Sequence, residues 1–241
     1  MSQNPTAAML VIGDEILSGR TRDSNMYHLA GQLTERGITL AEVRVVADDQ
    51  PAIVAAVQAL RAAHDHVFTS GGIGPTHDDI TADAMAAAFD VAITHRADAM
   101  ALLAANYASR GIEFNEARQR MARIPDTAVL IDNPVSVAPG FTLRNVHVMA
   151  GVPRIFEAML AGVLSHITGG APLLSRTLRL NRGEGEIATP FAAFAAQYPD
   201  LSMGSYPFNI DGSFGTNLVI RGTDPVLLDR VLAELTALLA A

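Results

Sequence analysis

The stretch HVFTSGGIGPTHDDITADAMAAAF, residues 66–89, is typical of a strand, a loop and a helix in succession. HVFTS is a short apolar run of the kind that forms a buried strand, and TADAMAAAF favours a helix. Between them, SGGIGPTHDDIT (70–81) combines three glycines and a proline with two adjacent aspartates. Because ligands of open parallel sheets bind beyond the carboxyl ends of the strands, this loop is expected at a binding edge.

The same alternation of strand and helix extends in both directions from this loop. Further strands are predicted for AMLVI (8–12), ITLAEVRVV (38–46), AVLID (128–132), GFTLR (140–144) and VHVMAG (146–151). Further helices are predicted for 23–37 and 51–63, for two stretches within 96–123, and from 153 to about 167. Strands separated by helices imply right-handed crossovers. We therefore predict an α/β fold over residues 1–168, a doubly wound, mostly parallel sheet flanked by helices.

A break in the pattern falls at TGGAP (168–172), which is rich in glycine and ends in proline. Beyond the break, the apolar runs predict a strand, a helix, two strands and a final helix, although Pro190 blurs the first helix. We therefore predict a second, smaller α+β domain over residues 172–241. A unit of about 70 residues is small for independent stability, so we expect it to pack on the larger domain.

Composition narrows the functional classes. The 241 residues are 49% hydrophobic, and 17 Lys and Arg against 25 Asp and Glu give a net charge of −8. Such a balance disfavours nucleic acid and anionic membrane surfaces as partners. The absence of cysteine excludes disulfides and thiolate chemistry. The N-terminal apolar run is too short for a signal peptide or a spanning helix, so we expect a cytoplasmic protein that acts on a small molecule.

The loop 70–81 combines hydrogen-bond donors that would attract a phosphate with carboxylates that would repel it. Its backbone N–H groups and hydroxyls are predicted to hold phosphate: Gly71, Gly72, Gly74, Thr76 and Thr81. Asp78 and Asp79 should repel the same phosphate, unless a divalent cation lies between carboxylate and phosphate. The alternative is a structural loop in which the glycines serve the turn and Asp79 caps the next helix. No lysine follows as in GxxxxGK[ST], so a Walker A loop is excluded.

Two other acidic segments follow predicted strands and should reach the same edge of the sheet. GDEILSG (13–19) brings Asp14 after the first strand, and ADD (47–49) brings Asp48 after the second. Capping of turns and helices remains the alternative role for these carboxylates. Asn25 either binds the ligand or caps a turn.

Taken together, these segments resemble the molybdopterin-binding (MoaB/Mog-type) superfamily. GDEILSG with DSN, SGGIGPTHDDIT, NPVSVAPGF (133–141) and GVPRIFEAM (151–159) follow in the order of the N-terminal region of the competence/damage-inducible protein A family. The segments GEGEIA (183–188) and MGSYP (203–207) are similar to the extension in that family and in the molybdopterin-binding-like domain of FAD synthases. The resemblance covers nearly the whole chain.

The resemblance implies phosphoanhydride chemistry in one of two forms. In molybdenum cofactor enzymes, the glycine loop serves pterin adenylylation, and the functional aspartates match Asp48 and Asp79. In competence-protein-like members, the fold is associated with metal-dependent cleavage of dinucleotides such as ADP-ribose or FAD. Ile73 and Asp78 stand where the pterin enzymes usually carry Thr and Arg, which favours the second form. Because the chain ends at Ala241, neither nicotinamide mononucleotide deamidation nor FAD synthesis is expected.

Our leading hypothesis is therefore a divalent-metal-dependent pyrophosphatase for a nucleoside diphosphate-linked substrate. Asp48 and Asp79 are the predicted catalytic residues, and Asp48, Asp78 and Asp79 the predicted ligands of Mg²⁺, Mn²⁺ or Co²⁺, with K⁺ as a further candidate ion. Asp14 and Asn25 would line the remaining side of the substrate. The alternatives are a nucleotide or molybdopterin binding protein without turnover and an interaction module. The resemblance also implies a homo-oligomer, a dimer or a trimer.

Overall fold

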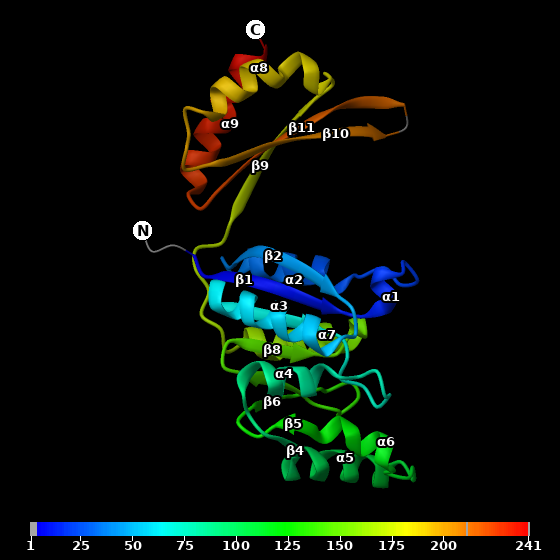
Figure 1. Ribbon diagram of the computed structural model, residues 1–241. Coiled ribbons are helices and arrows are strands. Elements are labelled where there is room, and N and C mark those ends of the chain that lie inside the picture. The colour runs from blue at the N-terminus through cyan, green and yellow to red at the C-terminus, as the bar shows by residue number, and fades with distance from the viewer. Residues whose placement is uncertain (1–3, 211, 241) are drawn as a thin grey trace. The chain divides into compact units, whose positions relative to one another are not determined.

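A computed structural model describes residues 4–210 and 212–240, and the chain forms two compact units (Figure 1). The first unit ends at Gly170 and the second begins at Ala171. The first contains two clusters of buried apolar side chains and the second contains one. None of the helices in the described ranges combines the length and the hydropathy that a membrane span requires.

The first unit is built on a six-stranded sheet with the strand order β2-β1-β3-β8-β7-β6. Its strands are β1 (Thr6–Ile12), β2 (Thr39–Val46), β3 (His66–Ser70), β6 (Val129–Ile131), β7 (Gly140–Leu143) and β8 (Val146–Met149). Strands β2, β1, β3 and β8 are parallel, so their carboxyl ends lie at one edge. Strand β7 runs antiparallel to both β8 and β6. The predicted mostly parallel sheet is confirmed, with β7 as the antiparallel exception.

Helices cover both faces of this sheet (Figure 1). The face with α2 (Asn25–Glu35) and α7 (Pro153–Leu164) forms one cluster, and the face with α3 (Gln50–Ala63) and α4 (Thr81–Phe89) forms the other. Strand β1 explains the two-sided core, because its successive apolar residues alternate between the two clusters. Each fully buried Leu or Met contributes about 1.5–3 kcal/mol. The one-turn helix α1 (Asp14–Leu17) follows β1 directly.

The segment after α4 differs from the prediction of two helices within 96–123. The first is present as α5 (Ala97–Ser109), but the second is only the single turn α6 (Glu116–Gln119), followed by the 3₁₀ turn η1 (Arg120–Ala122). The chain then enters β5 (Arg123–Pro125), which pairs antiparallel with β4 (Ile93–His95). The strand pairing ends the helical segment early, and it leaves the short 3₁₀ turn beside the glycine loop.

The second unit has the predicted order of strand, helix, strand, strand and helix. Its elements are β9 (Leu174–Leu180), α8 (Glu184–Ala195), β10 (Ser202–Ile210), β11 (Ser213–Gly222) and α9 (Pro225–Ala240). The three strands form an antiparallel sheet in the order β10-β11-β9. Apolar side chains of α8 and α9 pack with Leu218 and Ile220 of β11 to form its core. Helix α8 continues through Pro190. The antiparallel sheet with its two helices confirms the α+β prediction for this unit.

Candidate functional site

The glycine loop starts at the carboxyl end of β3 with two positive φ angles. Gly71 has φ of +111° and Gly72 has φ of +67°, a region that favours glycine. A Cβ atom on Gly71 would lie 2.1 Å from the Ile12 carbonyl oxygen, and one on Gly72 would lie 2.1 Å from the Thr81 hydroxyl oxygen. These glycines therefore let the loop pass close to β1 and α4. The structure thus shows the function that these glycines have in the alternative interpretation of the sequence, which is to allow the turn.

Thr81 takes part in the internal bonding of the loop and not in its predicted function as a phosphate donor. Its side chain is fully buried, and its hydroxyl donates to the Gly71 carbonyl at 3.0 Å. Its backbone N–H donates to the Gly72 carbonyl, also at 3.0 Å. Because the hydroxyl is already used and has no access to solvent, Thr81 fixes the shape of the loop from the first turn of α4.

Asp79 lies in the second half of the loop and does not cap α4. Its Oδ2 atom accepts hydrogen bonds from the backbone N–H of Thr76 at 2.8 Å and from the Thr76 hydroxyl at 2.5 Å. The residue that precedes α4 is Ile80, which provides no side-chain cap. Thr76 and Asp79 thus close the turn that contains His77 and Asp78, and Asp79 Oδ1 is the oxygen left for a ligand.

Three consecutive N–H groups in the loop remain available. In the part of the chain that the structure describes, no atom accepts a hydrogen bond from the N–H groups of Gly72, Ile73 or Gly74. All three residues line a cavity of about 520 Å³, together with Asp79 and Glu15. Successive backbone N–H groups without partners form an anion site when they face the same space. This cavity is therefore the strongest candidate for a phosphate position.

The acidic segments after β1 and β2 also reach this edge, as predicted. Asp48 Oδ2 accepts a hydrogen bond from the backbone N–H of Asp14 at 2.9 Å. Burial raises the pKa of Asp48, the bond from Asp14 opposes that effect, and the negative charges of Asp14, Glu15 and Asp78 raise the pKa further. These carboxylates are thus close enough to repel one another. Asp49 instead caps α3, because its side chain accepts from the Ala52 N–H at 3.0 Å.

Asn25 connects three segments at the carboxyl ends of β3 and β8. The side chain is 3% exposed, and its Nδ2 atom donates to Ser70 Oγ at 2.7 Å and to the Gly151 carbonyl at 2.8 Å. Its Oδ1 atom is buried and has no partner among the described residues. Asn25 therefore holds the end of β3 against the loop before α7. Its amide nitrogen is satisfied by these two hydrogen bonds, whereas its amide oxygen is not hydrogen-bonded to any described residue.

The block NPVSVAPGF forms another wall of the cavity through a turn organised by Asn133. Asn133 Oδ1 accepts from the N–H groups of Val135 and Ser136, and Nδ2 donates to the Ala138 carbonyl at 2.7 Å. Asn133, Ser136 and Ala138 all line the 520 Å³ cavity. Because both the oxygen and the nitrogen of the Asn133 amide form hydrogen bonds within the turn, Asn133 fixes the shape of this wall of the cavity.

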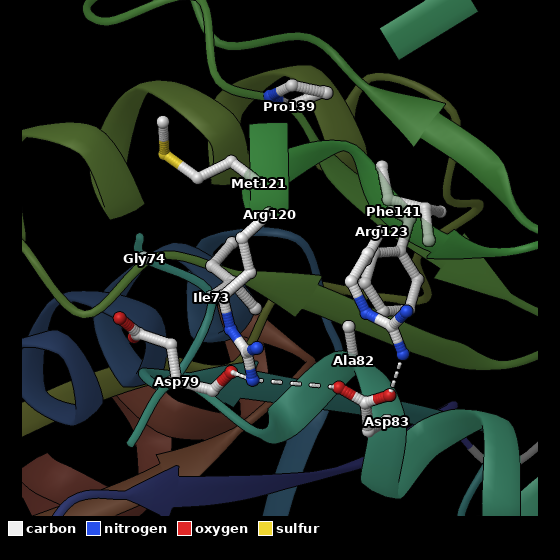
Figure 2. Close-up of a pocket in the computed structure, with 12 residues that line it drawn as sticks. Ile73, Gly74, Asp79, Ala82, Asp83, Arg120, Met121, Arg123, Pro139 and Phe141 are labelled. Atoms are coloured by element: carbon white, nitrogen blue, oxygen red, sulfur yellow. Dashed lines mark hydrogen bonds and ion pairs between the residues drawn. The ribbon is translucent and has the colours of Figure 1, made fainter. Parts of the chain in front are cut away.

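Figure 2 shows a group that the sequence did not reveal, in which Asp83 lies between the guanidinium groups of Arg120 and Arg123. Asp83 forms an ion pair with Arg123, and Arg120 lies 3.9 Å from the same carboxylate. Arg120 also donates to the backbone carbonyl of Asp79 at 3.2 Å. The η1 turn therefore supports the glycine loop at Asp79. Nothing in the sequence pattern indicated this contact, because it joins positions 41 residues apart.

Comparisons with known proteins agree with this geometry. Residues 8–173 match the family described as probable molybdopterin binding domain. The chain belongs to this family. Residues 172–241 match the middle domain of FAD synthase. The resemblance predicted from the sequence blocks is thereby confirmed for both units.

Individual relatives support the same assignment. A probable FAD synthase of Caenorhabditis elegans is 32% identical over 264 residues, which cover 100% of this chain and 51% of that protein. A protein of Metallosphaera sedula is 34% identical over 172 residues, 69% of this chain and 65% of that protein. The chain thus spans less than two thirds of either relative. The solved structure of CinA, a protein of unknown function from Thermoplasma acidophilum, is 32% identical with a TM-score of 0.62, covering 68% of this chain and 98% of that one.

Proposed function

We propose that this chain binds a phosphate-bearing nucleotide at the carboxyl ends of the parallel strands and hydrolyses its phosphoanhydride bond with a divalent cation. ADP-ribose and FAD represent the expected substrate class. The observation that carries the proposal is the row of free N–H groups at Gly72, Ile73 and Gly74 in a cavity next to the carboxylates around Asp48. The N–H groups attract a phosphate, and the carboxylates require a cation before a phosphate can approach.

The donor set fits a hard cation that is shared with the substrate. Carboxylate oxygens suit Mg²⁺, Mn²⁺ or Co²⁺, but the described residues contain no group of three or more acidic or imidazole side chains placed to hold a metal alone. Mg²⁺ is commonly held by one or two carboxylates plus phosphate oxygens. One or two of Asp48, Asp78 and Asp79, the last through Oδ1, are the candidate ligands. The bound cation would neutralise phosphate charge and polarise the phosphoryl group.

The protein groups would bind the diphosphate and activate water. The N–H groups of residues 72–74 donate to oxygens of the diphosphate and hold it still during attack. Asp48, whose pKa is raised by burial and by neighbouring charge, accepts the proton of the attacking water. The hydroxide adds to one phosphorus, the bridging bond breaks, and the other phosphate leaves with the bridging oxygen. Thr76 keeps Asp79 in place through the two hydrogen bonds described above.

The test is hydrolysis of ADP-ribose and FAD by the wild type, Asp48→Asn and Asp79→Ala in the presence of Mg²⁺, Mn²⁺ or Co²⁺. We expect each variant to lose at least about 100-fold in kcat/KM, because each removes a charged group at the reacting phosphate. Asp49→Asn is the matched control, since Asn also caps helices well and Asp49 points into α3. Equal activity in the wild type and Asp48→Asn, or no hydrolysis with any of the three metals, would refute the proposal.

Binding of a nucleotide or pterin without turnover is the second candidate. The observation that favours it is the absence, within the described ranges, of three metal-ligating side chains in one group. The free N–H groups of the loop would suffice for a phosphate in either case. Tight binding in EDTA with no product after metal addition would select this function, whereas formation of an adenylylated pterin from ATP would indicate pterin adenylylation instead.

A further inference from the structure

The sheet of the second unit has one face covered by helices and one face without a covering element of its own unit. Figure 1 shows α8 and α9 on the same side of strands β9, β10 and β11. The core residues Leu218 and Ile220 of β11 point to that side. On β9, the exposed positions alternate with half-buried leucines, as expected for a sheet with one open face. The open face therefore carries the other half of each strand.

Two aromatic rings lie flat on this open face. Tyr206 and Phe208 stand at alternate positions of β10 and so share a face. A Cβ atom on Gly204 would lie 3.0 Å from the Tyr206 hydroxyl oxygen, and one on Gly215 would lie 2.7 Å from Phe208 Cζ. Each ring thus occupies the space that a side chain would otherwise fill. The two glycines give the rings direct contact with the backbone.

Two arginines cover these rings and have no acidic partner among the described residues. The guanidinium carbon of Arg179 lies 4.0 Å from the Phe208 ring centroid, and that of Arg221 lies 5.3 Å from the Tyr206 centroid. Arg176, on the helix-covered side of β9, instead pairs with Asp229 at 2.6 Å. The open face therefore combines flat aromatic surface with two positive charges that no described carboxylate neutralises.

We propose that this open face of β9, β10 and β11 binds a free nucleotide, with the base stacked on the aromatic and guanidinium planes and the phosphate paired with Arg179 or Arg221. Aromatic rings and guanidinium groups stack on bases, and guanidinium also matches phosphate geometry. The unpaired arginines attract an anion, and the rings and guanidinium planes offer a surface on which a planar group stacks. A nucleotide supplies both. The net charge of −8 opposes a long polyanion, so a small nucleotide is the matching occupant.

This site would be distinct from the phosphate position at residues 72–74, because every residue that forms it belongs to the second unit. It does not depend on hydrolysis in the first unit. The local alternative is that the two cation–π pairs only stabilise the hairpin, at about 0.5–1 kcal/mol each at an exposed position. Binding of a nucleotide separates the two accounts, because stabilisation alone requires no ligand.

The experiment titrates ADP into the full chain in EDTA and follows backbone amide shifts by NMR. In EDTA we expect saturable shifts in β9, β10 and β11, and a separate set of shifts at 70–81 once Mg²⁺ is added. Adenosine, which lacks the phosphates, and inorganic phosphate, which lacks the base, should each bind β9, β10 and β11 at least about tenfold more weakly than ADP. Shifts confined to 70–81 would overturn the inference and leave the proposed hydrolase function intact.

The variants Arg179→Ala and Phe208→Ala test the assignment of residues. Each should weaken ADP binding at β9, β10 and β11 by about tenfold while leaving the shifts at 70–81 unchanged. Arg176→Ala is the matched control, because it removes an arginine from the same strand but from the other face. Arg179 is exposed, so Arg179→Ala decides the question even if Phe208→Ala impairs folding. The proposal fails if Arg176→Ala has the same effect, or if single-stranded oligonucleotides bind the face and ADP does not.

Discussion

The two ends of the parallel sheet in the first unit both contain titratable groups, but the environments of these groups differ. At the carboxyl end, burial and neighbouring carboxylates raise the pKa of Asp48. At the amino end, burial lowers the pKa of His147 to about 4, with a smaller contribution from the charge of His66. In both cases burial disfavours the charged form. The same physical cause therefore acts at opposite ends of the same strands.

The hydrogen bonding separates the two ends. His147 Nδ1 lies 3.0 Å from Thr142 Oγ1, and its Nε2 atom lies 3.4 Å from His66 Nδ1, so both ring nitrogens have partners. At the carboxyl end, the N–H groups of Gly72, Ile73 and Gly74 have no acceptor among the described residues. Free donors next to repelling carboxylates indicate a ligand site, whereas a neutral His147 with both ring nitrogens bonded indicates a stabilising function.

The largest expected effect on stability concerns the backbone of the glycine loop, at the carboxyl end of β3. Gly71→Ala places a Cβ atom 2.1 Å from the Ile12 carbonyl oxygen at a φ of +111°. We expect the free energy of unfolding to fall by at least about 3 kcal/mol, because backbone strain adds to a clash with β1. Gly19→Ala is the control, since Gly19 has φ of +73° but no atom within 4 Å of its Cβ position. Its loss should be about 1 kcal/mol. Equal losses in urea denaturation would show that the close approach to β1 is unimportant.

The next prediction concerns the amino end of the sheet and is tested by the pH dependence of the free energy of unfolding. The pKa of His147 in the folded protein is about 4, below the ordinary histidine value of 6.5, so its neutral form contributes stability that is fully present above pH 6.5. That contribution is lost as the pH falls toward 4, and it amounts to about 3 kcal/mol. His147→Gln, which cannot be protonated in this range, should lose less stability between pH 7 and 4.

The readout for this prediction is the difference in pH dependence between wild type and variant, because other groups titrate in both. His77→Gln is the control, since the His77 side chain is 99% exposed. It should leave the pH dependence unchanged. Parallel curves for the wild type and His147→Gln would mean that the imidazole is not kept neutral by burial.

Thr81→Val tests the connection between α4 and the glycine loop. The change keeps the shape of the side chain but removes the hydroxyl that donates to the Gly71 carbonyl at 3.0 Å. We expect a loss of about 1–2 kcal/mol in the free energy of unfolding, the cost of one buried hydrogen bond and an unpaired carbonyl. Thr81→Ser should recover most of this loss. If Thr81→Val and Thr81→Ser unfold at the same urea concentration, the hydroxyl does not hold the loop.

The sequence predicted the parts of this comparison that depend on local pattern. Apolar runs and glycine positions located the strands of the six-stranded sheet, the helices α2, α3 and α4, and the loop at residues 70–81, but not the pair β4 and β5. The carboxyl edge followed from the alternation of strand and helix, since parallel strands end together. The meeting of the loops at Asp14 and Asp48 was predicted for the same reason, and the structure joins them by a hydrogen bond.

What the sequence could not supply depends on contacts between distant segments. The use of the Thr81 hydroxyl by Gly71, and the support of the loop by Arg120, require positions that only the packed chain defines. The antiparallel direction of β7 depends on the tight connection to β8 at Arg144, whose φ of +53° is uncommon outside glycine. Local propensity therefore found the elements but not the partners of their side chains.

The smallest expected effect sharpens the comparison most, because it predicts a gain in stability at the end where function is proposed. Burial and like charges raise the pKa of Asp48, so its charged form destabilises the folded state above that pKa, and the penalty disappears as the carboxyl becomes protonated. Asp48→Asn removes the charge, and its Oδ1 atom can still accept the Asp14 N–H. We expect the variant to be more stable than the wild type by about 0.5 kcal/mol at pH 7, since solvent screens a half-buried group.

The same variant should lose the response to metal. With ADP already present, addition of Mn²⁺ should raise the Tm of the wild type further, because a ligand that binds only the folded state stabilises it. Asp48→Asn should show little of this rise, while Asp49→Asn should respond like the wild type. A variant that is less stable at pH 7 and still responds to Mn²⁺ would give Asp48 a structural function. In that case the raised pKa at the carboxyl end would reflect burial alone, and the two ends of the sheet would differ only in the sign of their charge.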